Sequence, residues 1–138
     1  MKYFILLLSS LMALSSCKSV RYTPKTYNDT QIVAGSSGGV TGMIREYSLL
    51  DNGQLFISKG FDGEWKEVKK IEKKKTQEIF NKATAIGLET IKFSHPGNMT
   101  YYLIMKTPPR KNEVRWGETG VAMPEKVKEF YDYLMTIF

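Results

Sequence analysis

The strongest constraint on the fold of this chain is the tripeptide Asp51-Asn52-Gly53, which separates two runs of alternating apolar and polar residues. Asn-Gly accepts the positive φ angles of a tight turn, so the tripeptide predicts a β-hairpin. Thr41–Leu50 before the turn and Gln54–Lys59 after it both alternate with a period of two, which is typical of strands with one buried face. We therefore expect an antiparallel sheet at the centre of the fold.

The remaining elements follow from apolar periodicity and turn residues. The other expected strands are Gln31–Ala34, Leu88–Phe93, Thr100–Lys106 and Glu113–Gly117, with Trp65–Val68 as an optional short strand. Helical spacing predicts one helix over Glu72–Ile86 and a second from Pro124 to the C-terminus. Gly87 is expected to end the first helix in a left-handed conformation. The predicted fold class is α+β, a two-layer sandwich of an antiparallel sheet with two helices on one face, in the order β-β-β-α-β-β-β-α.

The first sixteen residues are predicted to be a secretory signal peptide. Lys2 is their only charge, and Tyr3–Leu14 has ten apolar residues in twelve, which is too few for a bilayer span of about 20 residues but suits a signal peptide. The run ends in Leu14-Ser15-Ser16-Cys17, which resembles a bacterial lipobox. The resemblance implies cleavage before Cys17 and acylation of that cysteine. The alternative is an ordinary secretory signal followed by an unrelated cysteine.

The lipobox resemblance sets the expected domains, location and partners. Residues 1–16 would be the signal peptide, 17–30 the lipidated cysteine and a flexible tether, and 31–138 a single α+β domain. Two or more acyl chains would hold the protein stably at a membrane. Lys18 after the cysteine implies the outer membrane, with the domain facing the periplasm. There we expect a monomer that binds an envelope protein or a protease and does not bind nucleic acid.

Most of the positive charge lies in one segment. The formal net charge is +6, and Lys66–Lys75 contributes +4 of it from six lysines and two glutamates. A lysine cluster can bind anionic lipid headgroups or an acidic partner. It can equally be the solvated start of a helix, and the sequence leaves both interpretations open.

Few residue types in this chain are suited to catalysis. One cysteine and one histidine exclude an internal disulfide and a histidine-rich metal centre. His95 lies in a Pro-Gly turn, and no Gly-x-Ser-x-Gly motif supplies a nucleophile for it. We therefore predict no catalytic residue, metal or cofactor. A hydrolase that works with two carboxylates stays an alternative, and its candidate residues are Glu46, Asp51, Glu64, Glu113 and Glu118.

The glycine-rich segment Gly35–Gly42 is the candidate binding site. It lacks the Lys-Ser or Lys-Thr that ends a nucleotide-binding loop, and a strand rather than a helix follows it. Two interpretations remain, a hairpin that needs glycine dihedrals and an edge that docks a partner. The candidate binding residues are Ser37, Gly38, Gly39, Thr41 and Gly42.

The same segment also carries a resemblance to a known family. Ser37-Gly38-Gly39-Val40-Thr41-Gly42, with the order of elements after it, resembles the emfourin-like inhibitors of thermolysin-type metalloproteases. That resemblance implies protease inhibition. The function we favour from the sequence is a non-catalytic, lipid-anchored envelope protein that binds another protein or an envelope component. The alternatives are the emfourin-like inhibitor and a small carboxylate-dependent hydrolase.

Overall fold

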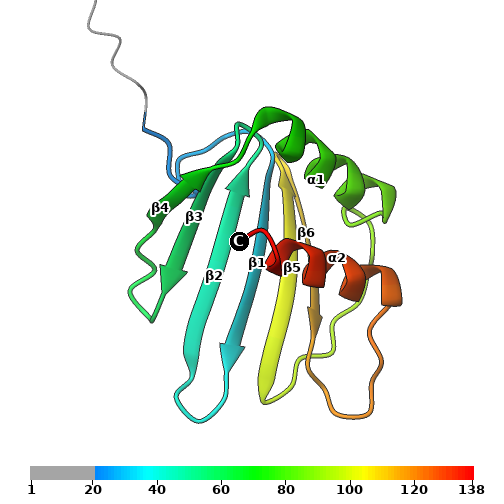
Figure 1. Cartoon of the computed structure of the whole chain (residues 1–138). Coiled ribbons are helices and arrows are strands. Elements are labelled where there is room, and N and C mark those ends of the chain that lie inside the picture. Colours follow the sequence, from blue (N-terminus) through cyan, green and yellow to red (C-terminus); the bar gives the residue numbers. More distant parts are fainter. Residues whose placement is uncertain (1–20) are drawn as a thin grey trace, which may run out of the picture.

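The structure of the protein is a computed structural model that describes residues 21–138. The predicted signal peptide and Cys17 lie outside the described residues. The described part is a six-stranded antiparallel sheet with two helices (Figure 1), which confirms the predicted α+β class. In chain order the elements are β1 (Gln31–Gly38), β2 (Met43–Leu50), β3 (Gln54–Lys59), β4 (Lys66–Lys70), α1 (Lys73–Ala85), β5 (Met99–Thr107), β6 (Arg110–Trp116) and α2 (Glu125–Met135). No helix in this part is long and apolar enough to cross a membrane.

The strands lie in the order β4-β3-β2-β1-β5-β6, and β1 is a central strand. Ala34 of β1 lies opposite Tyr47 of β2 on one side and opposite Leu103 of β5 on the other. The hairpin predicted from Asn-Gly is present between β2 and β3, where Gly53 has a φ of 93° and donates its N–H to the Leu50 carbonyl. The middle of the sheet therefore joins segments that are far apart in the sequence.

The predicted order of elements needs a correction, because four strands precede α1 and two lie between the helices. The optional strand is real as β4, whereas Leu88–Phe93 is not a strand. Its backbone turns after Gly87, which has a φ of 75° as expected for the end of the first helix. The side-chain amide of Asn112 then donates to the carbonyls of Leu88 and Ile91, both at 2.8 Å. The buried Asn112 side chain thus satisfies backbone carbonyls that would bond to a neighbouring strand if this segment lay in the sheet.

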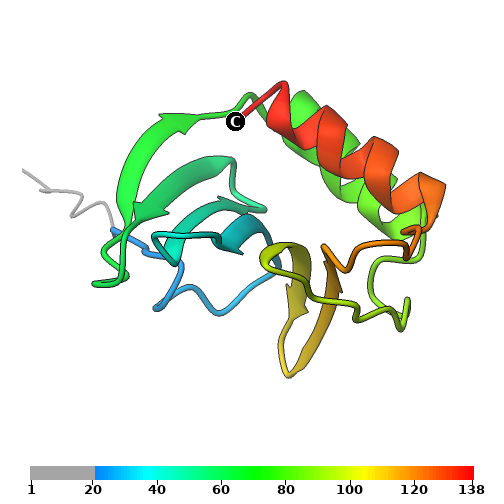
Figure 2. The same cartoon turned by 90° about the horizontal axis from the view of Figure 1, so that it is seen from below.

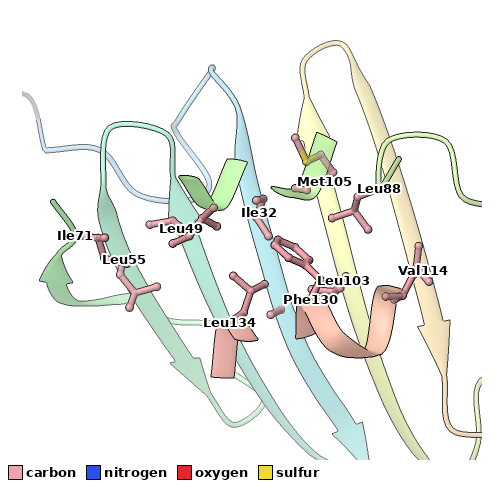
Figure 3. Packing of buried hydrophobic residues seen from close by; sticks show 14 residues of the cluster. Ile32, Leu49, Leu55, Ile71, Leu88, Leu103, Met105, Val114, Phe130 and Leu134 are labelled. Carbon is pink, nitrogen blue, oxygen red and sulfur yellow. The ribbon is translucent and has the colours of Figure 1, made fainter. Parts of the chain in front are cut away.

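The main core lies between one face of the sheet and the two helices. Figure 2 shows both helices on the same side of the sheet, and we call the side that they cover the helix face. Figure 3 shows Leu103 and Val114 from the strands beside Phe130 and Leu134 from α2. These four side chains are at most 4% exposed. Phe130 and Leu134 thus fix α2 to the sheet as part of the core.

The opposite face of the sheet, which we call the open face, is partly covered by residues before β1. Tyr27 packs against Leu50 and Phe56, with Trp65 alongside. The side chain of Gln31 donates to the Pro24 carbonyl at 3.1 Å and accepts from Ser48 at 3.1 Å. The described part of the predicted tether is therefore folded onto the sheet, and the domain begins before Gln31.

Candidate functional site

The glycine-rich segment forms the end of β1 and the tight turn into β2. The predicted strand Gln31–Ala34 is too short, because β1 continues to Gly38. The turn that follows, Gly39–Gly42, we call the glycine loop, and the Gly42 N–H donates to the Gly39 carbonyl across it. Gly38, Gly39 and Gly42 have φ values of 105°, 74° and 62°. The hairpin interpretation of these glycines is therefore correct, because side chains rarely accept such angles.

Gly38 is also fixed by a close contact with the loop before β5. A Cβ on Gly38 would lie 2.1 Å from the carbonyl oxygen of Asn98, and that same oxygen accepts the Gly39 N–H at 2.9 Å. The backbone of the segment Gly38-Gly39 thus packs directly on the backbone of Asn98. Side chains are excluded here by contact as well as by dihedral angle.

The two hydroxyl residues of the candidate site occupy different surroundings. Thr41 is exposed in the glycine loop, and its Oγ1 accepts the Met43 N–H at 3.4 Å. Ser37 is half-buried and lines a groove on the open face. Both hydroxyls lie near the loop, and neither belongs to the hydrophobic core.

Four large apolar side chains surround the glycine loop, and we call them the apolar rim: Val40, Met43, Phe61 and Met99. Met43 and Met99 lie opposite Gly38 on its two neighbouring strands. The Phe61 ring lies where a Cβ on Gly42 would approach it to 3.7 Å, yet the Phe61 side chain is 75% exposed. Figure 1 shows α2 crossing the middle of the sheet, so the strand ends near the loop extend beyond it.

The apolar rim is not predicted by the periodicity of the sequence, although another signal for it exists. Phe61 stands between Gly60 and the Asp62-Gly63 pair, and large apolar residues inside tight turns have no core to enter. Val40 stands in the same way inside the glycine loop. Met99 had no such signal, because the register of β5 against β1 is what brings it to Gly38.

A groove of about 370 Å³ adjoins the apolar rim on the open face. It is lined by Ser37, Ile44, Glu46, Ser58, Gly60, Phe61, Gly63, Tyr102, Ile104, Lys111, Glu113 and Arg115. Ser37 and Phe61 thus connect the groove to the glycine loop and the rim. The groove and the rim together form the candidate binding site.

The floor of the groove is shaped by Tyr102, which reaches across β1. A Cβ on Gly35 would lie 2.6 Å from the Tyr102 ring, so the ring occupies the space that a side chain on β1 would take. The Tyr102 hydroxyl then donates to Glu46 Oε1 of β2 at 2.8 Å. The pKa of Tyr102 is raised well above its usual range, mainly by burial of the hydroxyl and next by its hydrogen bond to Glu46. One side chain thereby joins three strands.

Charged groups of both signs lie along the rest of the groove. Glu113 Oε2 is 3.7 Å from the Lys111 Nζ, and Glu113 Oε1 is 3.5 Å from the Arg115 Nε. The Arg115 Nε is buried and has no hydrogen-bond partner among residues 21–138. Glu46 and Glu113 line the same groove, so the structure brings together two of the five carboxylates considered for hydrolysis. A groove with both signs of charge offers complementary contacts to a ligand that also carries both signs.

His95 forms a pair that was not expected from the sequence. Its Nδ1 lies 2.9 Å from Glu118 Oε2, and both side chains are about half exposed. The backbones of the two residues are also joined, since the Glu118 N–H donates to the His95 carbonyl. The pair holds the loop before β5 to the loop after β6. Among the described residues no group of three or more His, Cys, Asp or Glu side chains could hold a metal ion.

Comparisons with known proteins do not assign the chain to a family. No protein-family model matches the sequence, and no curated protein is significantly similar to it. The site must therefore be interpreted from its own geometry.

Proposed function

We propose that this protein is a non-catalytic, lipid-anchored envelope lipoprotein that binds another protein through the apolar rim and the adjoining groove. In this proposal Cys17 carries the lipid and the domain is a two-layer module with both helices on one face of the sheet. That arrangement leaves the open face and the glycine-loop end to a partner. The proposed location is the periplasmic side of the outer membrane.

The observation that carries the proposal is the exposure of the apolar rim. Four large apolar side chains gather around one loop, and Phe61 and Met43 are 75% and 54% exposed. Exposed apolar side chains gathered at one place are typical of interaction sites in folded domains. Methionine adapts its shape to a partner, and phenylalanine and methionine are both enriched in the cores of protein interfaces. The expected partner is thus a protein with an apolar projection flanked by polar groups.

The anchor is tested by the chemistry of Cys17. Mass spectrometry of the mature protein should find Cys17 as the first residue and bearing acyl chains, because the lipobox directs both steps. The wild-type protein should be found in the membrane fraction as the processed, lipidated form. A Cys17→Ser variant, expressed from the full-length sequence, should not yield a processed form in that fraction. An unmodified Cys17, or a variant that stays in the membrane fraction as a processed chain, would contradict the anchor.

The binding surface is tested by Phe61→Ala. A photo-crosslinking amino acid that replaces Phe61 should capture a partner in the native envelope. The same amino acid in place of the exposed Glu129 of α2 is the control and should capture none. Binding of the captured partner to purified Phe61→Ala should be about tenfold weaker, a loss of about 1.4 kcal/mol. The free energy of unfolding should change by less than about 0.5 kcal/mol, because Phe61 lies outside the core.

The two hydroxyl residues sharpen this test. Thr41→Ala and Ser37→Ala should also weaken binding several-fold with folding intact, since neither side chain lies in the core. Unchanged affinity in all three variants would reject the rim as the binding surface. Titration of the purified protein against a thermolysin-type protease then separates emfourin-like inhibition from binding to another envelope protein.

A further inference from the structure

The strongest charged surface of the domain is formed by β4 and the first turn of α1, and we call it the lysine edge. It consists of the exposed side chains of Lys66, Lys69, Lys70, Lys73 and Lys74. β4 is the outer strand of the sheet, and all five of its residues are exposed. Lys69 donates to the Ile137 carbonyl. Within residues 21–138 the other four lysines form no ion pair with a carboxylate.

Two of these lysines lie where their charge destabilises the folded domain. Lys73 and Lys74 begin α1, whose N-cap residue is Glu72; the first turn itself has no acidic residue, and no side chain forms a capping hydrogen bond. The amino end of a helix carries partial positive charge, so cations there are destabilising and an anion close to them is stabilising. Lysines on an edge strand are explained by protection against strand pairing. Protection against strand pairing does not explain the lysines at the start of α1. A nearby anionic surface would be favourable for the lysines of β4 and of α1 alike.

The entering chain connects the lysine edge with the proposed anchor. Figures 1 and 2 both show the chain entering the described part beside β4. Lys25 of the entering segment lies near the loop before β4, because a Cβ on Gly63 would be 3.9 Å from its Nζ. Cys17 precedes Arg21 by four residues, which span at most about 14 Å when fully extended. An anchor at Cys17 therefore keeps this side of the domain close to the bilayer.

We infer that the lysine edge rests on anionic lipid headgroups and orients the domain on the membrane. This inference rests on the proposed acylation of Cys17. At physiological salt the Debye length is about 8 Å, so lysines held this close to the bilayer still attract anionic lipid. Each such lysine strengthens attachment about fivefold. The edge would thus add orientation to an anchor that by itself leaves the domain free to rotate.

Lysine labelling tests the inference on the lipidated mature protein. The protein is reconstituted into phosphatidylcholine vesicles with or without phosphatidylglycerol and treated with an acetylating reagent, and mass spectrometry measures the rate at each lysine. Phosphatidylglycerol should slow labelling of Lys70, Lys73 and Lys74 about fivefold or more. The exposed Lys111, on the opposite edge strand β6, and the exposed Lys126 of α2 are internal controls and should keep their rates. About 1 M salt, with a Debye length near 3 Å, should abolish the difference.

Two further arms make the result decisive. In a Lys73→Glu/Lys74→Glu variant, phosphatidylglycerol should no longer slow labelling of Lys70, while the melting temperature should rise because the helix start gains favourable charge. Inorganic phosphate added to phosphatidylcholine vesicles should have no effect. Equal rates in both vesicles, equal slowing at the control lysines, or slowing by inorganic phosphate would each overturn the inference. The intact mass of the same sample reports the lipid at Cys17, so failure of the anchor is recognised separately.

Discussion

Truncation of Phe130 to alanine should lower the free energy of unfolding by about 3–5 kcal/mol. Phe130 is 4% exposed and lies in α2 within the core cluster that joins both helices to the sheet. Its removal leaves a cavity that rigid strands on one side cannot close. Leu134→Ala, at a fully buried position one turn later, should cost about 2–5 kcal/mol for the same reason. Chemical denaturation followed by circular dichroism measures both losses.

The control for these variants is Glu129→Ala, an exposed position on the same helix. It should change the stability by less than about 0.5 kcal/mol. A loss that small in Phe130→Ala would mean that α2 contributes little to the core. The apolar side of α2 would then become a second candidate for partner binding.

Gly38→Ala should destabilise the protein by about 3 kcal/mol or more. The substitution forces a side chain into a φ of 105°, and it drives the new Cβ to 2.1 Å from the Asn98 carbonyl oxygen. Dihedral strain alone costs about 1–3 kcal/mol, and the backbone contact adds an overpacking cost of similar size. Thermal and denaturant unfolding measure the sum.

Gly120→Ala separates the two contributions. Gly120 has a φ of 83°, but a Cβ there would meet nothing within 4 Å, so only the dihedral cost of about 1–2 kcal/mol is expected. Gly39→Val should fall between them, at about 1–3 kcal/mol, since its nearest neighbour is the flexible end of Met99. Equal losses at Gly38 and Gly120 would show that the loop before β5 yields to the new side chain.

Local signals in the sequence were enough to find most elements of the fold. The Asn-Gly turn placed the first hairpin, and helical spacing placed α1 and α2. Leu88–Phe93 was misassigned because a short apolar run looks the same whether it pairs in a sheet or turns beneath a helix. The side chain that decides between them, Asn112, lies about twenty residues further on in β6. Periodicity does not report such a contact.

The candidate site was predictable only in its local part. The glycine-rich turn depends on residues that are consecutive in the sequence. The structure confirms their backbone role through three positive φ angles. The groove depends on Glu46 and Tyr102, which are 56 residues apart and meet because β1 lies between β2 and β5. That strand order is a result of packing over the whole domain. The sequence pattern of either strand alone does not contain it.

The contact between Tyr102 and Gly35 restricts how this domain can change during evolution. A larger residue at position 35 collides with the ring, and a smaller residue at position 102 uncovers a glycine in the middle of a central strand. Each substitution alone destabilises the sheet, so we expect the two positions to be replaced together. Relatives of this protein should therefore divide into those that keep both residues and those that have exchanged both, with intermediates rare.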